Sequence, residues 1–182
     1  LFCISGRLDS SFSTSLKLEK MTTGEKAGLW GTVTNTNLDL VEQAVGGYVE
    51  LSLASGNQTP AISDGAASDG RNKVIKLTGT LSANRSLIFP DSCEKTYLVI
   101  EGTTRSSSHY TITIKTSSGT GVAMPVGSTM LVIVDGTNVI TGITQKGYVT
   151  TTGAYTAVNG DQVIVDTSAA AVTVTLPASP AV

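Results

Sequence analysis

Apolar and polar residues alternate over short stretches in most of the chain, which is the pattern of strands with one buried face. The strands that this alternation predicts lie at residues 49–53, 73–78, 86–89, 96–101, 110–116, 121–124, 129–135 and 138–143. Gly, Asn and Asp separate them, and Asp135-Gly136 predicts a hairpin turn between the last two. Residues 13–18 also alternate and predict one short strand near the start of the chain.

The period changes from two to about 3.6 between residues 35 and 45. Apolar residues then recur at i, i+3, i+6 and i+7, which places them on one stripe: Leu38, Val41, Ala44 and Val45. Thr34 or Asn35 can cap the start of a helix, and the Gly46-Gly47 pair stops it. The sequence therefore predicts a helix over residues 35–45.

A strand–turn–strand phrase occurs twice along the chain. Residues 74–78 lead into 87–92, residues 163–167 lead into 174–179, and both copies close on Pro-x-Ser. Further strands follow the first copy, whereas the second copy stops at Val182, in the middle of a module. Similar β-modules in series are typical of structural or binding proteins rather than of self-contained enzymes.

Four parts make up the predicted domain organisation. They are an N-terminal attachment segment that carries the helix (residues 1–47), a first β-module (48–143), a linker (144–153) and the start of a second β-module (154–182), with strands at 157–165 and 171–176. The predicted fold class is all-β, built from short-strand sandwich or fibre modules with one short N-terminal α-helix. Such modules leave unpaired strand edges that favour aggregation unless they are covered, so we expect an oligomer.

The composition argues against several classes of protein. Hydrophobic residues make up 40% of the chain and charged residues 14%, so the chain is expected to fold. The net charge is −2 and there is no run of Lys or Arg, so we expect no nucleic-acid partner. No apolar run has the length that crosses a bilayer, so we expect no membrane insertion.

Candidate chemical groups are few. His109 is the only histidine, which excludes a His-based metal cluster, and it follows a Ser run typical of loops. Gly119-Thr120-Gly121 lacks the Lys-Ser/Thr of a phosphate loop and is interpreted as a turn, as is the segment from Gly24 to Gly28. Several Asp residues without calcium-loop spacing are interpreted as turn formers: Asp64, Asp69, Asp91 and Asp135. The sequence predicts no catalytic residue, no metal, no cofactor and no enzyme activity, although carboxylates that converge in the fold keep a glycoside-hydrolysing alternative open.

Two cysteines and one tryptophan have alternative interpretations. Cys3 and Cys93 are interpreted as free thiols, with Cys93 a small buried hydrophobe, and a disulfide between them is the alternative. Trp30 is either a buried anchor that fixes the helix to the β-module or an interface aromatic that contacts a partner. The buried anchor is favoured, because large aromatic residues serve packing more often.

A longer phrase carries a resemblance to a known family. Residues 16–37 contain Gly24-Glu25, then Trp30-Gly31 and Thr34-Asn35-Thr36-Asn37, and Glu42-Gln43-Ala44 follows near the end of the predicted helix. This run resembles the start of tail-fibre-like structural proteins of marine (cyanophage- or pelagiphage-type) tailed bacteriophages. Residues 116–121, 134–138 and 165–178 are similar to other phrases of these proteins. The resemblance extends over most of residues 16–182.

The resemblance implies a component of the virion, commonly an intertwined homotrimer. Its N-terminal part would attach to other tail or virion proteins, and its distal parts would reach the host surface. The residues before Ser13 lie outside the resemblance and are interpreted as an anchoring extension. Candidate attachment residues lie in the shared phrase and the helix: Trp30, Asn35, Asn37, Leu38 and Val41.

The function expected from this resemblance and from the β-modules is that of a virion structural protein. The chain would be the virion-proximal part of a tail fibre that carries distal host-adhesion modules, located in the virion tail after assembly in the host cytoplasm. The alternatives are a head fibre or capsid-decorating protein, and a polysaccharide-degrading tailspike.

Overall fold

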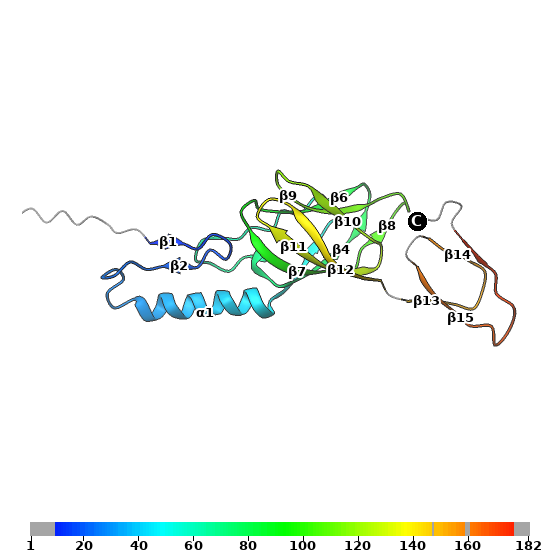
Figure 1. The fold of residues 1–182 in the computed structure, drawn as a ribbon, viewed down its shortest axis with the longest axis horizontal. Coiled ribbons are helices and arrows are strands. Elements are labelled where there is room, and N and C mark those ends of the chain that lie inside the picture. Colours follow the sequence, from blue (N-terminus) through cyan, green and yellow to red (C-terminus); the bar gives the residue numbers. More distant parts are fainter. Residues whose placement is uncertain (1–9, 147, 159–160, 177–182) are drawn as a thin grey trace, which may run out of the picture.

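The computed structural model describes residues 10–146, 148–158 and 161–176. These residues form an elongated molecule, with a helix and a hairpin at one end, a β-sandwich in the middle and a small β-unit at the other end (Figure 1). The predicted class, mostly β with one N-terminal α-helix, is confirmed for the described residues.

A mixed five-stranded sheet, in the order β12-β11-β7-β4-β3, forms one layer of the sandwich. Its strands are β3 (Tyr48–Ser52), β4 (Val74–Thr78), β7 (Glu94–Glu101), β11 (Ser128–Asp135) and β12 (Val139–Lys146). The first three run parallel to one another, and β11 and β12 are antiparallel to their neighbours. The β11–β12 connection is the predicted Asp135-Gly136 turn, in which the Asp135 carboxylate accepts hydrogen bonds from the amides of Thr137 and Asn138.

A three-stranded sheet, in the order β10-β9-β6, packs against the first sheet. Its strands are β6 (Arg85–Phe89), β9 (Ile112–Thr116) and β10 (Gly121–Met124). Alternate residues of both sheets point inward and are buried, as the period-two pattern predicts. At the centre, the rings of Phe89 and Tyr97 stack with their centroids 4.2 Å apart.

Three short elements were not anticipated in this region. The short strands β5 (Thr80–Leu81) and β8 (Thr104–Arg105) pair in parallel, and a single 3₁₀ turn, η1 (Asp69–Arg71), precedes β4. The eight strands predicted between residues 49 and 143 are all present: 121–124 is matched to the residue, and the others differ by one to three residues at an end.

Helix α1 (Trp30–Gly46) is longer than predicted at its start. The expected cap at Thr34 or Asn35 is wrong, because the helix begins five residues earlier, after Leu29, and no side chain caps it. The predicted stop is confirmed. Gly47 is extended and its amide bonds to the carbonyl of Gln43, and a Cβ at this position would collide with that same carbonyl.

The predicted strand at residues 13–18 is wrong. This stretch is the turn of a hairpin between β1 (Ser11–Phe12) and β2 (Glu19–Lys20). Ser13 closes the turn, because its hydroxyl accepts a hydrogen bond from the amide of Leu18 and its carbonyl accepts one from Lys17, which has a positive φ of 55°. Such local side-chain bonds compete with strand pairing.

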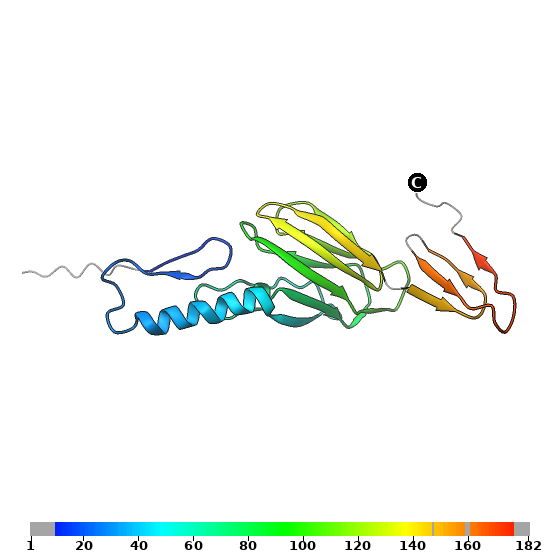
Figure 2. The ribbon, with the colours of Figure 1, turned by 60° about the horizontal axis from the view of Figure 1, so that its bottom comes forward.

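The C-terminal unit consists of two parallel strand pairs at the end opposite to α1 (Figure 2). Its strands are β13 (Tyr148–Thr151), β14 (Tyr155–Thr156), β15 (Gln162–Val165) and β16 (Val174–Thr175). The prediction of a linker at 144–153 is wrong, because these residues contain the end of β12 and all of β13. The predicted strands at 157–165 and 171–176 shorten to β15 and β16, and residues 159–160 lie outside the described residues.

Candidate assembly surface on helix α1

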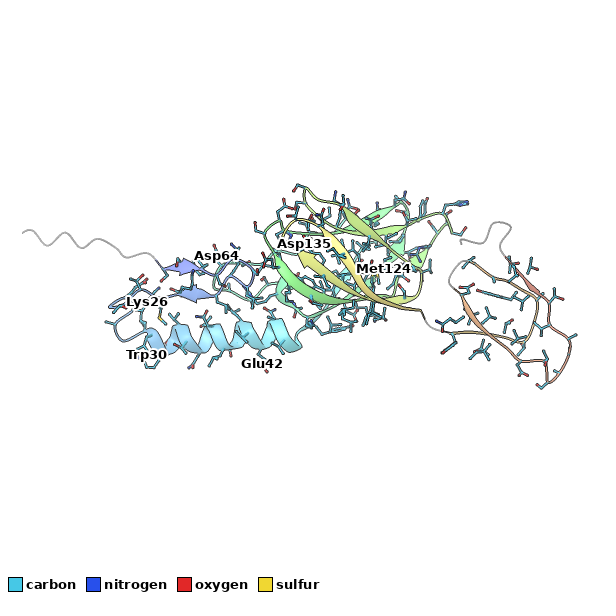
Figure 3. The ribbon with its side chains drawn as sticks, viewed as in Figure 1. Lys26, Trp30, Glu42, Asp64, Met124 and Asp135 are labelled. Carbon is cyan, nitrogen blue, oxygen red and sulfur yellow. The ribbon has the colours of Figure 1, made fainter. Side chains whose placement is uncertain are left out.

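Large apolar side chains are exposed along one side of α1. Trp30 is 65% exposed, Leu38 61% and Val45 73%, and Val41 is also exposed. At 100° per residue these four side chains fall within an arc of about 80°. We call these four residues the α1 stripe. Figure 3 shows Trp30 and Glu42 on the side of the helix away from the β1–β2 hairpin.

The spacing within the α1 stripe follows that of a coiled-coil seam. Leu38, Val41 and Val45 are three and four residues apart, as a and d positions of a heptad are. Tyr48, the first residue of β3, comes three residues later and is also exposed. In coiled coils a seam of this spacing, repeated over several heptads, packs against an equivalent helix, and α1 carries one such step.

The side of α1 next to the stripe is already covered by the molecule itself. Leu40 and Ala44 are buried there, although Ala44 was expected to share a stripe with Leu38. Asn37 fixes the helix to the hairpin, because its side-chain amide donates to the carbonyl of Glu19 at 2.8 Å and accepts from the amide of Glu19 at 3.0 Å. Asn37, a predicted attachment residue, is thus engaged within its own chain, whereas Asn35 is exposed.

The prediction that Trp30 is a buried anchor is wrong. Trp30 follows a turn in which Lys26 and Gly28 have positive φ values of 58° and 76°. This turn connects the hairpin to the first residue of the helix. The side chain therefore starts the helix on its uncovered side. The alternative, that Trp30 contacts a partner, stays a prediction.

A buried arginine holds the helix, the hairpin and the sandwich together. Arg71 is fully buried, and its guanidinium donates to the carbonyls of Leu16 in the hairpin turn (3.0 Å), Ser63 (2.7 Å) and Ala66. It also lies 3.5 Å from the side-chain oxygen of Gln43 in α1. Burial lowers the pKa of Arg71 below its usual range. Sequence reasoning missed this residue, since an Arg in a Gly- and Asp-rich loop carries no signal of burial.

A neighbouring lysine continues this link into the sandwich. The ammonium of Lys95 in β7 donates to the carbonyls of Arg71 at 2.6 Å and Asn72 at 2.7 Å. It also lies 4.1 Å from the centre of the Tyr97 ring, whose hydroxyl donates to the carbonyl of Gly70. Burial, together with the repulsion from the nearby positive charges of Lys73 and Arg71, lowers the pKa of Lys95 to about 8.

The charges on α1 are acidic. Asp39 and Glu42 are exposed, and the helix contains no Lys or Arg. Glu42 lies next to the α1 stripe, at the flanking position where coiled coils place charges that select partners. Copies joined along this stripe would each carry this acidic helix, so we expect salt to screen the repulsion between them and to strengthen their association.

Among the described residues, no three His, Cys, Asp or Glu side chains lie close enough together to hold a metal ion. His109 is exposed in a loop, with its Nδ1 3.2 Å from the hydroxyl of Ser107. Cys93 is buried, as predicted, and burial raises the pKa of its thiol. Cys3, its alternative disulfide partner, lies outside the described residues.

A cavity of about 690 Å³ lies between the sandwich and the C-terminal unit. Arg105 lines it and is held by Glu101 at 3.5 Å and by the carbonyl of Tyr110 at 2.9 Å. The exposed ring of Tyr148 and the hydrogen-bonded pair of Tyr155 and Asp161 line the other side. The lining thus combines apolar rings with a few charged and hydroxyl groups.

Comparisons with known proteins found no match to a family model, to a curated protein or to a solved structure. Within the described part of the chain, α1 is too short and too polar to cross a bilayer, and no helix there meets the requirements of a membrane span.

Proposed function

We propose that the chain is a virion structural protein, the virion-proximal part of a trimeric phage tail fibre. The observation that carries the proposal is the exposed α1 stripe, whose spacing suits self-association while the adjacent side of the helix is already occupied. The resemblance of residues 16–37 to tail-fibre-like proteins supports the same assignment.

The identities of the seam residues favour more than two chains. With Leu38 at an a position, Val41 falls at d and Val45 at the next a. Leu at a with Ile at d shifts parallel coiled coils from dimers towards trimers and tetramers, and Val41 at d is β-branched like Ile. A trimer is the state that the resemblance implies.

The arrangement along the molecule suits a shaft. Helix α1 and the hairpin lie at one end, and the sandwich and the C-terminal unit follow in series towards the other end (Figure 2). In the proposed fibre, the end with α1 and Trp30 attaches to other tail or virion proteins, and the opposite end continues towards the modules that contact the host.

Paired variants test the oligomeric state and its seam together. Val45→Lys places a charge in the seam, whereas the control Thr32→Lys adds the same charge at another exposed position of α1. Sedimentation equilibrium should show trimers for the native chain and for Thr32→Lys, and monomers for Val45→Lys with its β-sheet circular dichroism retained. A native monomer, or a Val45→Lys variant that stays trimeric, would contradict the proposal.

The location in the particle needs a separate experiment. Electron microscopy of virions that carry a tag on this chain should show the tag on the tail. A tag found on the capsid would replace the tail-fibre assignment with that of a head fibre or decorating protein.

A further inference from the structure

The two sheets of the sandwich differ in the faces that they turn away from the core. On the three-stranded sheet, the outward row at the level of Thr113 is small and polar, because Thr113 of β9 lies between Ser86 of β6 and Ala123 of β10. Lys115, the next outward residue of β9, continues this character. Such a face is typical of a sheet with one side in water.

The outward face of the five-stranded sheet carries instead an apolar row that crosses every strand. Its members are paired from one strand to the next and are Tyr48 of β3, Val74 of β4, Leu98 of β7, Leu131 of β11 and Ile143 of β12. Paired residues lie on the same face, and the buried core residues of these strands alternate with these five, so the five side chains face outward. We call them the apolar row.

Further apolar side chains widen the apolar row. Ile133 of β11 and Ile140 of β12 are paired with each other beside it, and they are 41% and 49% exposed. At the two ends of the row, Tyr48 is 52% exposed and Ile143 67% exposed. The described residues therefore leave a large apolar surface open on this side of the sandwich.

The sequences of the central strands agree with a face that is covered in the assembled protein. Residues 98–100 are Leu-Val-Ile and residues 130–134 are Met-Leu-Val-Ile-Val, so apolar residues occupy successive positions without alternation. Unbroken runs of this kind are typical of strands that are buried on both faces. The core of the sandwich fills the inward face only.

The charges on this face are arranged as in the core and rim of a protein interface. Beside the apolar row, Glu50 and Lys76 form an ion pair at 3.1 Å, and the hydroxyl of Tyr48 donates to Glu50 at 2.6 Å. Glu94 and Asp135 lie opposite each other at one end of the sheet, four residues along their strands from the row. Interfaces have a centre that is poor in charge and a polar rim. A neutral centre can face an identical copy without repulsion, whereas it gives no attraction for a strongly charged partner.

The apolar row begins where the α1 stripe ends. Tyr48 follows three residues after Val45, the last member of the stripe, and both side chains are exposed. Helix α1 and the sandwich follow one another along the molecule (Figure 1), so copies that join along α1 bring their sheets together as well. This continuity identifies the partner as further copies of the same chain.

The dimensions of the face suit a trimer. Five strands at about 4.8 Å each give a width of about 24 Å, and three faces of this width, placed as the sides of a triangular prism, lie about 7 Å from its axis. Packed sheets are about 10 Å apart, which leaves about 5 Å on each side, so large side chains on the middle strand can reach the axis. Leu98 is the member of the apolar row on that strand.

The area of the face is in the range of a stable interface. Five residues of each strand at about 3.3 Å give a projected area of roughly 400 Å². The α1 stripe adds roughly 200 Å² over a helix length of about 20 Å. Together they approach the roughly 800 Å² that each partner contributes to a stable interface.

We propose that the apolar rows of three copies pack against one another around the axis that the α1 stripes define. The five-stranded sheets then form the sides of a prism, and the three-stranded sheets face the solvent. This inference rests on the trimer of the proposed function and adds a second contact surface to it.

A charge at the centre of the face tests the proposal. Leu98→Lys places three ammonium groups near the axis, and it should raise the protein concentration at which half of the trimers dissociate by about tenfold or more in sedimentation equilibrium. The matched control is Thr113→Lys, which adds the same charge to an outward, half-buried position of the middle strand of the other sheet. It should change this concentration by less than about twofold.

Hydroxyl-radical labelling followed by mass spectrometry tests the same surface without a substitution in it. The rates at Leu131 and Ile143 should be about threefold or more lower in the native trimer than in the monomeric Val45→Lys variant, because the core of an interface excludes water. Ile88, an outward residue of the three-stranded sheet, should be labelled equally in both.

The outcomes separate this inference from the proposed function. A trimer that Leu98→Lys leaves intact, while Val45→Lys dissociates it, would overturn the inference and leave the proposed function standing. A monomeric native chain would remove both. Slow labelling of the apolar row in the Val45→Lys monomer too would mean that the chain covers this face itself, which also contradicts the inference.

Discussion

Replacing Arg71 by Ala should destabilise the junction between α1, the hairpin and the sandwich. The guanidinium is fully buried and supplies donors to the carbonyls of Leu16, Ser63 and Ala66, three groups in two different segments. No carboxylate pairs with it among the described residues, so its value lies in these backbone contacts rather than in an ion pair.

The magnitude follows from two opposing effects. Each buried carbonyl that loses its donor costs about 1–3 kcal/mol, and the truncated side chain leaves a void that adds to the loss. The substitution also removes a buried cation that has no acidic partner, and burying such a charge is unfavourable, as the lowered pKa of Arg71 indicates. This gain offsets part of the lost stability. We expect the free energy of unfolding to fall by about 3–5 kcal/mol.

Urea denaturation at one fixed protein concentration measures the change, and Arg85→Ala is the matched control. Arg85 also donates to a backbone carbonyl, that of Leu53 at 3.0 Å, but it is partly exposed and water can replace it, so its loss should cost about 1 kcal/mol or less. Hydrogen exchange in the Arg71→Ala variant should accelerate first in residues 11–20. Equal losses for the two variants, or a hairpin that keeps its protection, would refute this account of Arg71.

Three further predictions concern the sandwich. The pKa of Lys95 is lowered to about 8 in the folded state, so the unfolded chain binds more protons than the folded chain between pH 8 and 10. The free energy of unfolding should therefore rise by about 2 kcal/mol from pH 8 to pH 10, as measured by thermal or urea unfolding. The Lys95→Gln variant should not show this rise. Above pH 10 the trend should reverse, since burial raises the pKa of Tyr97 and its hydroxyl must stay protonated in the fold. Gly119→Ala should lower the melting temperature by several degrees, because its Cβ would collide with a backbone carbonyl, whereas Gly153→Ala, in open space, should leave it unchanged. Cys93 should react with a thiol reagent only at the rate of unfolding, as followed by mass spectrometry, and fast labelling in the native state would show that it is not buried.

Local patterns in the sequence predict much of the sandwich. The strand at residues 121–124 is predicted to the residue, and the Asp135-Gly136 turn depends on a positive φ at Gly136 that few residues favour. The Gly46-Gly47 helix stop needs a residue without a Cβ, because a Cβ at Gly47 would collide with the carbonyl of Gln43. By contrast, Tyr148–Thr151 was assigned to a linker, because its run of threonines lacks alternation and its partner β15 follows later in the chain.

The candidate site could be predicted only in part. The apolar periodicity of α1 locates a helix, but it cannot decide which side is covered, since Leu40 and Ala44 on one side and Leu38 and Val45 on the other are equally apolar. The hairpin decides it, through a contact between Asn37 and a backbone 18 residues away. Tertiary contacts of this kind leave no local trace in the sequence.

The distance between equivalent α1 helices tests the central claim most directly. A nitroxide at position 32, attached to Thr32→Cys in a Cys3→Ser background with Cys93 buried, reports this distance by pulsed electron spin resonance without altering the α1 stripe. Packed helices lie about 8–10 Å apart, so parallel copies should place the labels within about 30 Å of one another, with three coupled spins in each particle. A sample without dipolar coupling at the same concentration would show that α1 does not join copies of the chain.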